Sequence, residues 1–205
     1  MKIGVLISGR GSNLKSLIDA CAAPGFPAEM VLVISNKADA GGLQFARDAG
    51  IPTRVVSHRD YDSREAFDRV MDEALREAGV DFVCSAGFMR ILSDEFVEKW
   101  RDRQLNIHPS LLPSFKGLNV YARAIEAGCK ISGCTVHFVR AAMDEGPIVA
   151  QTAVPVLEGD TPETLAARIL EAEHKLYPHA LRLVAEGRVT IVDERCVIEG
   201  DTTVA

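Results

Sequence analysis

The sequence predicts an α/β protein with a mostly parallel sheet, helices on both faces of that sheet, and a mixed sheet toward the C-terminus. Short apolar runs such as 2–7 and 81–86 are typical of strands that are buried on both faces. Segments with helical spacing of apolar residues alternate with these runs. The segment 148–156 is expected to run antiparallel to its neighbour 131–139, which makes the sheet mixed.

The elements follow from local signals taken in chain order. Further strands are expected at 31–34, at 53–57, around Asn106 and His108, and at 189–193. Helices are expected after the glycine-rich turn 8–13, at 41–49 up to Gly50, from Ser63, at 93–100, and from Thr161 with Pro162 in its first position.

Length and composition indicate one domain spanning 1–205 without a linker, since the Gly/Pro clusters are only turn-sized. A net charge of −6 argues against a nucleic-acid or anionic-membrane binder. Five cysteines without a Cys-x-x-Cys pair favour reduced thiols. Neither a signal peptide nor a membrane span is evident, so the expected location is the cytoplasm.

Two polar side chains mark the end of the strand around residue 107. Asn106 and His108 alternate with Ile107 and therefore share one face, and Pro109 ends the hydrogen-bonded ladder. An amide donor beside an imidazole suits acyl transfer, in which negative charge develops on a carbonyl oxygen. The alternative is a histidine that only bonds to backbone at a strand end.

The turn Ser8–Asn13 is rich in glycine and lies between a buried strand and a helix. Backbone N–H groups at such a helix start attract a phosphate, with Ser12 or Asn13 expected as the helix cap. The turn lacks the Lys-Ser/Thr of a nucleotide P-loop and the third glycine of a dinucleotide fingerprint. A phosphomonoester is therefore favoured over ATP or NAD, with an ordinary tight turn as the alternative.

Four further features are candidates for ligand contact. Arg64, in a first helical turn, suits a carboxylate ligand or is a solvated surface cation. The apolar loop 87–92 lines a pocket for a flat ring or plugs the core. Asp144 either forms its Gly-Pro turn or faces His108. Glu173 lies on the apolar stripe of its helix, where it meets a ligand donor or an internal partner.

A zinc site involving Cys129, Cys134 and His137 is disfavoured. The odd spacing of Cys134 and His137 places them on opposite faces of a strand, and no fourth ligand is evident.

Taken together, these motifs resemble the glycinamide ribonucleotide formyltransferases of purine biosynthesis over nearly the whole chain. The resemblance rests on the turn 8–13, the run 106–117, the strand 133–139, the turn 144–147 and Glu173-His174-Lys175. It implies the Rossmann-like formyltransferase fold, with a nucleotide-phosphate-binding half at 1–100 and a catalytic and folate-binding half at 101–205.

The resemblance also implies the reaction and its residues. A formyl group moves from 10-formyltetrahydrofolate, a co-substrate, to the amine of the nucleotide, and neither a metal ion nor ATP is required. The partners are small molecules, without nucleic acid or membrane, and the chain acts as a monomer or homodimer. The implied catalytic residues are Asn106, His108 and Asp144. The implied nucleotide-binding residues are Gly11, Ser12, Asn13 and Glu173. The implied folate-binding residues are Arg64, Met89, Arg90, Ile91, Leu92, Asn106, Arg140, Ala141, Ala142, Met143 and Asp144.

Three positions depart from the usual family pattern. Histidine is frequent in the family at the positions of Asn119 and Tyr121, and polar residues are usual at that of Leu170. Two other functions remain as alternatives, namely a formyltetrahydrofolate hydrolase and a non-catalytic module that senses a phosphorylated metabolite. The sensor would use the glycine-rich turn but would not need Asn106, His108 or Asp144.

Overall fold

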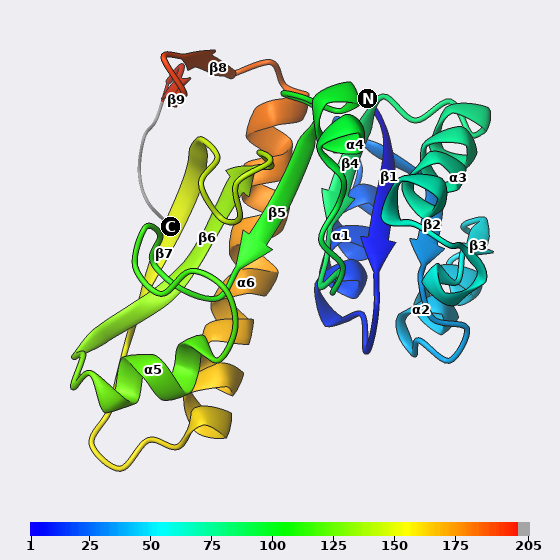
Figure 1. Ribbon diagram of the computed structural model, residues 1–205. Helices are drawn as coiled ribbons and strands as arrows, with labels where there is room; N and C mark the ends of the chain where they lie inside the picture. Colours follow the sequence, from blue (N-terminus) through cyan, green and yellow to red (C-terminus); the bar gives the residue numbers. More distant parts are fainter. Residues whose placement is uncertain (201–205) are drawn as a thin grey trace. The chain divides into compact units, whose positions relative to one another are not determined.

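The computed structural model describes residues 1–200 and consists of two compact units, one from Met1 to Asn106 and one from Ile107 onward (Figure 1). Strand β5 (Gln104–His108) passes from the first unit into the second.

The first unit is built on a parallel sheet. Its strand order is β3 (Thr53–Val55), β2 (Glu29–Ser35), β1 (Lys2–Ile7), β4 (Phe82–Ser85) and β5. All of its pairings are parallel. The carboxyl ends of the strands therefore lie along one edge of the sheet, where ligand sites of such folds are usually found.

Helices cover both faces of this sheet, as the sequence predicts. They are α1 (Ser12–Ala22), α2 (Gly42–Asp48), α3 (Arg64–Glu77) and α4 (Asp94–Lys99), with the 3-10 turn η1 (His58–Asp60) before α3. Leu6 packs into a buried cluster with Phe67 of α3 and Phe96 of α4. The next residue, Ile7, points the other way, toward Gly42 of α2. This alternation places apolar side chains on both faces of β1.

The second unit joins an antiparallel strand pair to a long helix (Figure 1). Strands β6 (Ile131–Phe138) and β7 (Ile148–Pro155) pair in antiparallel register, from Ile131 opposite Pro155 to His137 opposite Ile148. The expected mixture of parallel and antiparallel strands is therefore confirmed. Helix α6 (Pro162–Ala185) packs against both β6 and β7.

Local chemistry explains where α6 begins. The Thr161 hydroxyl accepts a hydrogen bond from the Thr164 amide, the Thr164 hydroxyl accepts one from the Thr161 amide, and Pro162 occupies the first helical position. This start agrees with the sequence prediction. Within residues 1–200, no helix is both long and apolar enough to cross a membrane.

The second unit also contains elements that the sequence did not indicate. Helix α5 (Val120–Glu126) follows Asn119, whose backbone is left-handed at φ 57°. The expected terminal strand is the first half of a hairpin, β8 (Val189–Val192) and β9 (Arg195–Ile198). Asn tolerates the left-handed region better than most residues, which suits Asn119 to its place before α5.

Candidate active site

The glycine-rich turn after β1 is shaped by a close backbone approach. The Gly42 amide donates to the Gly9 carbonyl at 3.0 Å. A Cβ placed on Gly11 would collide with the Cα of Gly42, and one placed on Gly42 would lie 2.8 Å from Ile7 Cδ1 and 2.9 Å from Gly11 Cα. Neither glycine has room for a side chain, so the turn depends on Gly11 and Gly42 together.

The expected cap of α1 is wrong. Gly11 is the N-cap residue, with a left-handed backbone at φ 78°, and no side chain of the described residues caps the helix. Ser12 and Asn13 instead lie within the first turn, where Ser12 is half-buried and Asn13 is buried. Glycine adopts this backbone conformation without strain, and amides at the start of a helix attract anions.

Ser8 connects this turn with the loop 87–92. Its hydroxyl donates to Asn36 Oδ1 at 2.6 Å and accepts from the Met89 amide at 2.8 Å. Ser8 is itself only 4% exposed. The start of the loop is thus held by a buried hydroxyl that adjoins the glycine-rich turn.

Asp68 of α3 holds the other end of the same loop. Its Oδ2 accepts from the Ser93 amide at 2.6 Å, and Ser93 also caps α4 through a bond from the Phe96 amide. Burial raises the pKa of Asp68, although the bonds from Ser93 oppose this shift. The sequence analysis missed Asp68, because its position on an otherwise ordinary amphipathic helix carries no sign of its contact with Ser93.

The middle of this loop combines apolar character with exposure. Met89 is 67% and Ile91 57% exposed, and Arg90 between them is exposed as well, whereas Phe88 and Leu92 pack against the buried cluster. The loop is therefore anchored at its edges and presents apolar groups at its centre. Met89 and Ile91 suit the expected role in ring binding, and Phe88 and Leu92 suit the expected role in core packing.

Arg64 is exposed at the first position of α3. The pKa of Asp68 is raised by burial, and the positive charge of Arg64 offsets part of this rise. Exposure fits a carboxylate ligand and a solvated cation equally, so its folate role stays a prediction.

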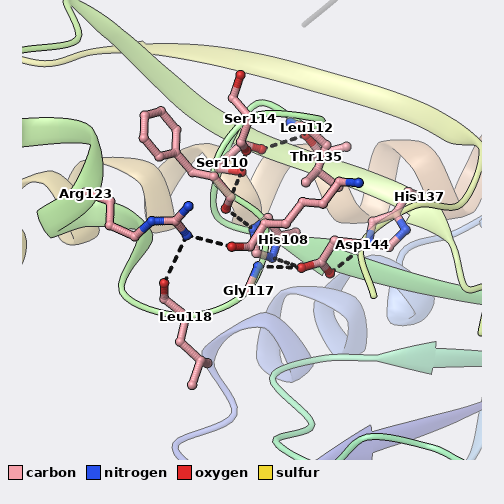
Figure 2. Close-up of polar contacts among 12 residues, drawn as sticks. His108, Ser110, Leu112, Ser114, Gly117, Leu118, Arg123, Thr135, His137 and Asp144 are labelled. Atoms are coloured by element: carbon pink, nitrogen blue, oxygen red, sulfur yellow. Dashed lines mark hydrogen bonds and ion pairs between the residues drawn. The ribbon is translucent and has the colours of Figure 1, made fainter. Parts of the chain in front are cut away.

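In the second unit, the structure brings His108 and Asp144 together (Figure 2). His108 Nδ1 lies 3.5 Å from Asp144 Oδ2, and both side chains are less than 10% exposed. The Gly117 amide donates to the same carboxylate oxygen at 2.9 Å. Asp144 has a left-handed backbone at φ 55° in its turn. The carboxylate is therefore held by a backbone amide and also faces the His108 ring. Asp144 thus has both of its expected places, in the turn and beside His108.

Hydrogen bonding defines the protonation of the His108 ring. Its Nε2 lies 3.0 Å from the Phe115 carbonyl oxygen, and a carbonyl can only accept, so Nε2 carries a proton. The Nδ1 atom faces the Asp144 carboxylate, which is also an acceptor. The ring is thus held between two oxygen acceptors, one facing each of its nitrogens.

A second histidine lies on the other side of the carboxylate. His137 Nε2 is 3.8 Å from Asp144 Oδ1 (Figure 2). His137 Nδ1 donates to the Phe138 carbonyl at 2.9 Å. Burial lowers the pKa of His137 despite the opposing effects of Phe138 and Asp144. Sequence reasoning considered His137 only as a zinc ligand and missed its place beside Asp144. Its separation of seven positions from Asp144 does not by itself indicate proximity.

The apolar loop after His108 is held by a buried hydroxyl. Thr135 Oγ1 donates to the Ser110 carbonyl at 2.6 Å and accepts from the Leu112 amide at 3.0 Å. The Gln151 side chain adds bonds to Thr135 and to the Leu112 carbonyl, each at 2.9 Å. These bonds attach the loop to β6 and β7 and so hold in place the segment that directly follows β5.

Residues 140–143 precede Asp144 and carry the expected folate contacts. Ala141, Ala142 and Met143 are exposed, whereas the Arg140 side chain is only 10% exposed. Asn106, also expected to contact folate, is half-buried and lies two residues before His108 on β5.

Glu173 is 5% exposed on the buried stripe of α6, together with Leu165, Ile169 and Leu176. The predicted position of this acid on the apolar face is therefore confirmed. Burial, with a smaller contribution from the Glu173 charge, raises the pKa of Cys134 to about 12. No group of three or more His, Cys, Asp or Glu residues in the described part of the chain is arranged to hold a metal ion.

Comparison with known proteins gives consistent results. Residues 1–181 match the family model described as formyl transferase. The chain is 56% identical to the trifunctional purine biosynthetic protein adenosine-3 of Bos taurus over 93% of its own length, but it spans only 19% of that protein. It is 44% identical to the phosphoribosylglycinamide formyltransferase of Escherichia coli K12, covering 98% of this chain and 94% of that one. The crystal structure of glycinamide ribonucleotide transformylase 1 from Symbiobacterium toebii superposes with a TM-score of 0.95 at 51% identity, covering 97% of this chain and 93% of that one.

Proposed function

We propose that this chain, which belongs to the formyl transferase family, transfers the formyl group of 10-formyltetrahydrofolate to the amine of N1-(5-phospho-D-ribosyl)glycinamide. The products are formylglycinamide ribonucleotide and tetrahydrofolate. The observation that carries this proposal is the likeness, over almost the full length of both chains, to the Escherichia coli enzyme and to the Symbiobacterium toebii structure.

The buried pair of His108 and Asp144 supports the chemistry. The nucleotide amine attacks the formyl carbon, and negative charge develops on the formyl oxygen. The His108 ring, held between Phe115 and Asp144, and the Asn106 amide stabilise that charge. Asp144 keeps the ring oriented and helps a proton reach the leaving folate nitrogen, so that the amine loses a proton as the leaving nitrogen gains one.

Each substrate has a proposed set of contacts. The amides of Gly11, Ser12 and Asn13 bind the nucleotide phosphate, and Glu173 binds the glycinamide part. Folate contacts Arg64, the exposed loop 89–92 and the segment 140–144. The exposed side chains of Met89 and Ile91 suit the aromatic ring of a folate, because burying these apolar surfaces against each other is favourable.

An assay with 10-formyltetrahydrofolate, with and without the nucleotide, tests the proposed function. Tetrahydrofolate should form only when the nucleotide is present, together with the formylated nucleotide. Folate turnover without nucleotide would identify a hydrolase. Binding of the nucleotide without any turnover would identify the sensor.

Replacing Glu173 with glutamine should raise the KM for the nucleotide by about tenfold or more, because a hydrogen bond to a charged group contributes about 1.5 to 3 kcal/mol. The KM for formylfolate should change much less. Steady-state kinetics with each substrate varied in turn measure both values. Glu171→Gln removes the same charge from an exposed position of α6 and is the matched control. Equal losses for both substrates, or loss of folded protein, would instead make Glu173 a structural acid.

Tyr121, on α5, tests whether a histidine at that position is needed for chemistry. Tyrosine donates a hydrogen bond but has a reference pKa of about 10, so it is a poor proton carrier near neutral pH. We expect Tyr121→His to leave kcat within about tenfold, a change in barrier of about 1.4 kcal/mol. A rise of several orders of magnitude would mean that the native substrate or reaction of this chain has diverged from that of the family.

A further inference from the structure

The C-terminal hairpin β8–β9 contacts the segment that precedes Asp144. Glu194, in the hairpin turn, accepts a hydrogen bond from Arg140 Nε at 2.6 Å. The Arg140 side chain is only 10% exposed, whereas that of Glu194 is 53% exposed. Arg140 also donates to the Val139 carbonyl at 3.1 Å. A largely buried cation thus donates both to a carboxylate of the hairpin and to the backbone carbonyl of the preceding residue.

Arg140 transmits this contact to the turn that carries Asp144. A Cβ placed on Gly146 would lie 3.3 Å from Arg140 Cγ and would collide with the Phe138 carbonyl oxygen. The aliphatic part of Arg140 therefore lies against Gly146, two residues after Asp144. A displacement of the Arg140 side chain would free space beside this turn, in which Asp144 has a left-handed backbone.

The hairpin is itself well defined. Its two turn residues, Asp193 and Glu194, both have positive φ, 48° and 56°, which matches the backbone of a tight hairpin turn and which Gly, Asn and Asp adopt more readily than most residues. Arg188 Nε donates to the Glu199 carbonyl at 2.9 Å and closes the base of the hairpin. Strand β9 also lies against β7. The Glu194 carboxylate is therefore presented from a fixed position.

We propose that Glu194 is a positioning residue and that the β8–β9 hairpin acts as a clamp on the segment 140–146. By holding Arg140, the clamp sets the conformation in which residues 140–144 receive the folate and in which Asp144 faces His108. The assignment of a folate to this segment rests on the proposed function, whereas the clamp itself rests on the contacts of Arg140.

Glu194→Gln tests the proposal in the full chain. The KM for formylfolate should rise about threefold to tenfold, while the KM for the nucleotide and the thermal midpoint stay nearly unchanged. The matched control is Asp193→Asn, which removes a charge from the adjacent turn residue and should have no effect on either KM. The double variant Arg140→Glu with Glu194→Arg restores an ion pair of reversed direction. Its KM for formylfolate should therefore be lower than that of the single variant Glu194→Arg. An unchanged folate KM in Glu194→Gln, or an equal rise in both KM values, would overturn the clamp.

Hydrogen exchange separates this proposal from the proposed function. The backbone amides of 141–146 should exchange several-fold faster in Glu194→Gln than in the unaltered chain, and Asp193→Asn should not change them. This readout needs no substrate, so it tests the clamp even if the unaltered chain does not transfer formyl groups. Equal exchange in all three proteins would overturn the clamp and would leave the proposed function to its own assay.

Discussion

Replacing His108 with alanine should lower kcat on the order of a hundredfold or more, because the variant lacks the group proposed to stabilise the developing oxyanion. The buried ring lies between the Phe115 carbonyl and the Asp144 carboxylate, and an alanine side chain reaches neither of them. Single-turnover and steady-state rates with saturating substrates measure the loss. His179→Ala, which removes a half-buried histidine of α6, is the control and should leave kcat within a few-fold.

A double-mutant cycle then separates the roles of His108 and Asp144. If Asp144 acts through the ring, Asp144→Asn should reduce kcat strongly in the unaltered chain but only slightly when His108 is already alanine. Independent, multiplicative losses would contradict the proposal that Asp144 acts by orienting His108. The Gly117 amide should keep the asparagine side chain near its native place, which limits structural side effects.

Replacing Gly11 with alanine should produce the second largest effect, an increase of about tenfold or more in the KM for the nucleotide. The left-handed backbone at φ 78° costs an alanine about 1 to 2 kcal/mol, and the new methyl group would collide with Gly42. The turn must open to relieve the collision, which moves the amides proposed to bind the phosphate. Substrate kinetics and the thermal midpoint should both report this change.

Gly9→Ala is the matched control for Gly11→Ala. A Cβ on Gly9 would have no heavy atom within 4 Å, and its φ is not in the left-handed region. The nucleotide KM of Gly9→Ala should stay within a few-fold of that of the unaltered chain. If Gly11→Ala also preserves the nucleotide KM, the phosphate must bind elsewhere.

The sequence predicted most elements whose signals are local. The start of α6 at Thr161 and Pro162, the helix expected from about Ser93 and the apolar strands all depend on residues within a few positions of one another. The residues 120–126 escaped notice because this helix is short and buries only Val120 and Ala124, which is too few positions to define an apolar stripe.

The candidate site was predictable in residue type but not in its supporting contacts. The residues Asn106, His108 and Asp144 carry chemical signals in the sequence itself. In contrast, Gly11 and Gly42, which leave no room for a side chain on each other, are 31 positions apart in the sequence. The approach of His137 to Asp144 depends on the path of the chain after β6. Such contacts are set by tertiary packing, which a linear pattern does not record.

The burial of Cys134 has a consequence for the redox behaviour of this protein. With a pKa raised to about 12, the thiolate form at pH 7 is roughly one part in a hundred thousand, and the thiolate is the species that oxidants and alkylating agents attack. Cys134 lies on β6, one residue before the Thr135 hydroxyl that holds the loop after His108. Burial thus disfavours oxidation of a sulfur atom in the framework of the site, and the more exposed Cys129 and Cys196 are expected to react with oxidants before Cys134 does.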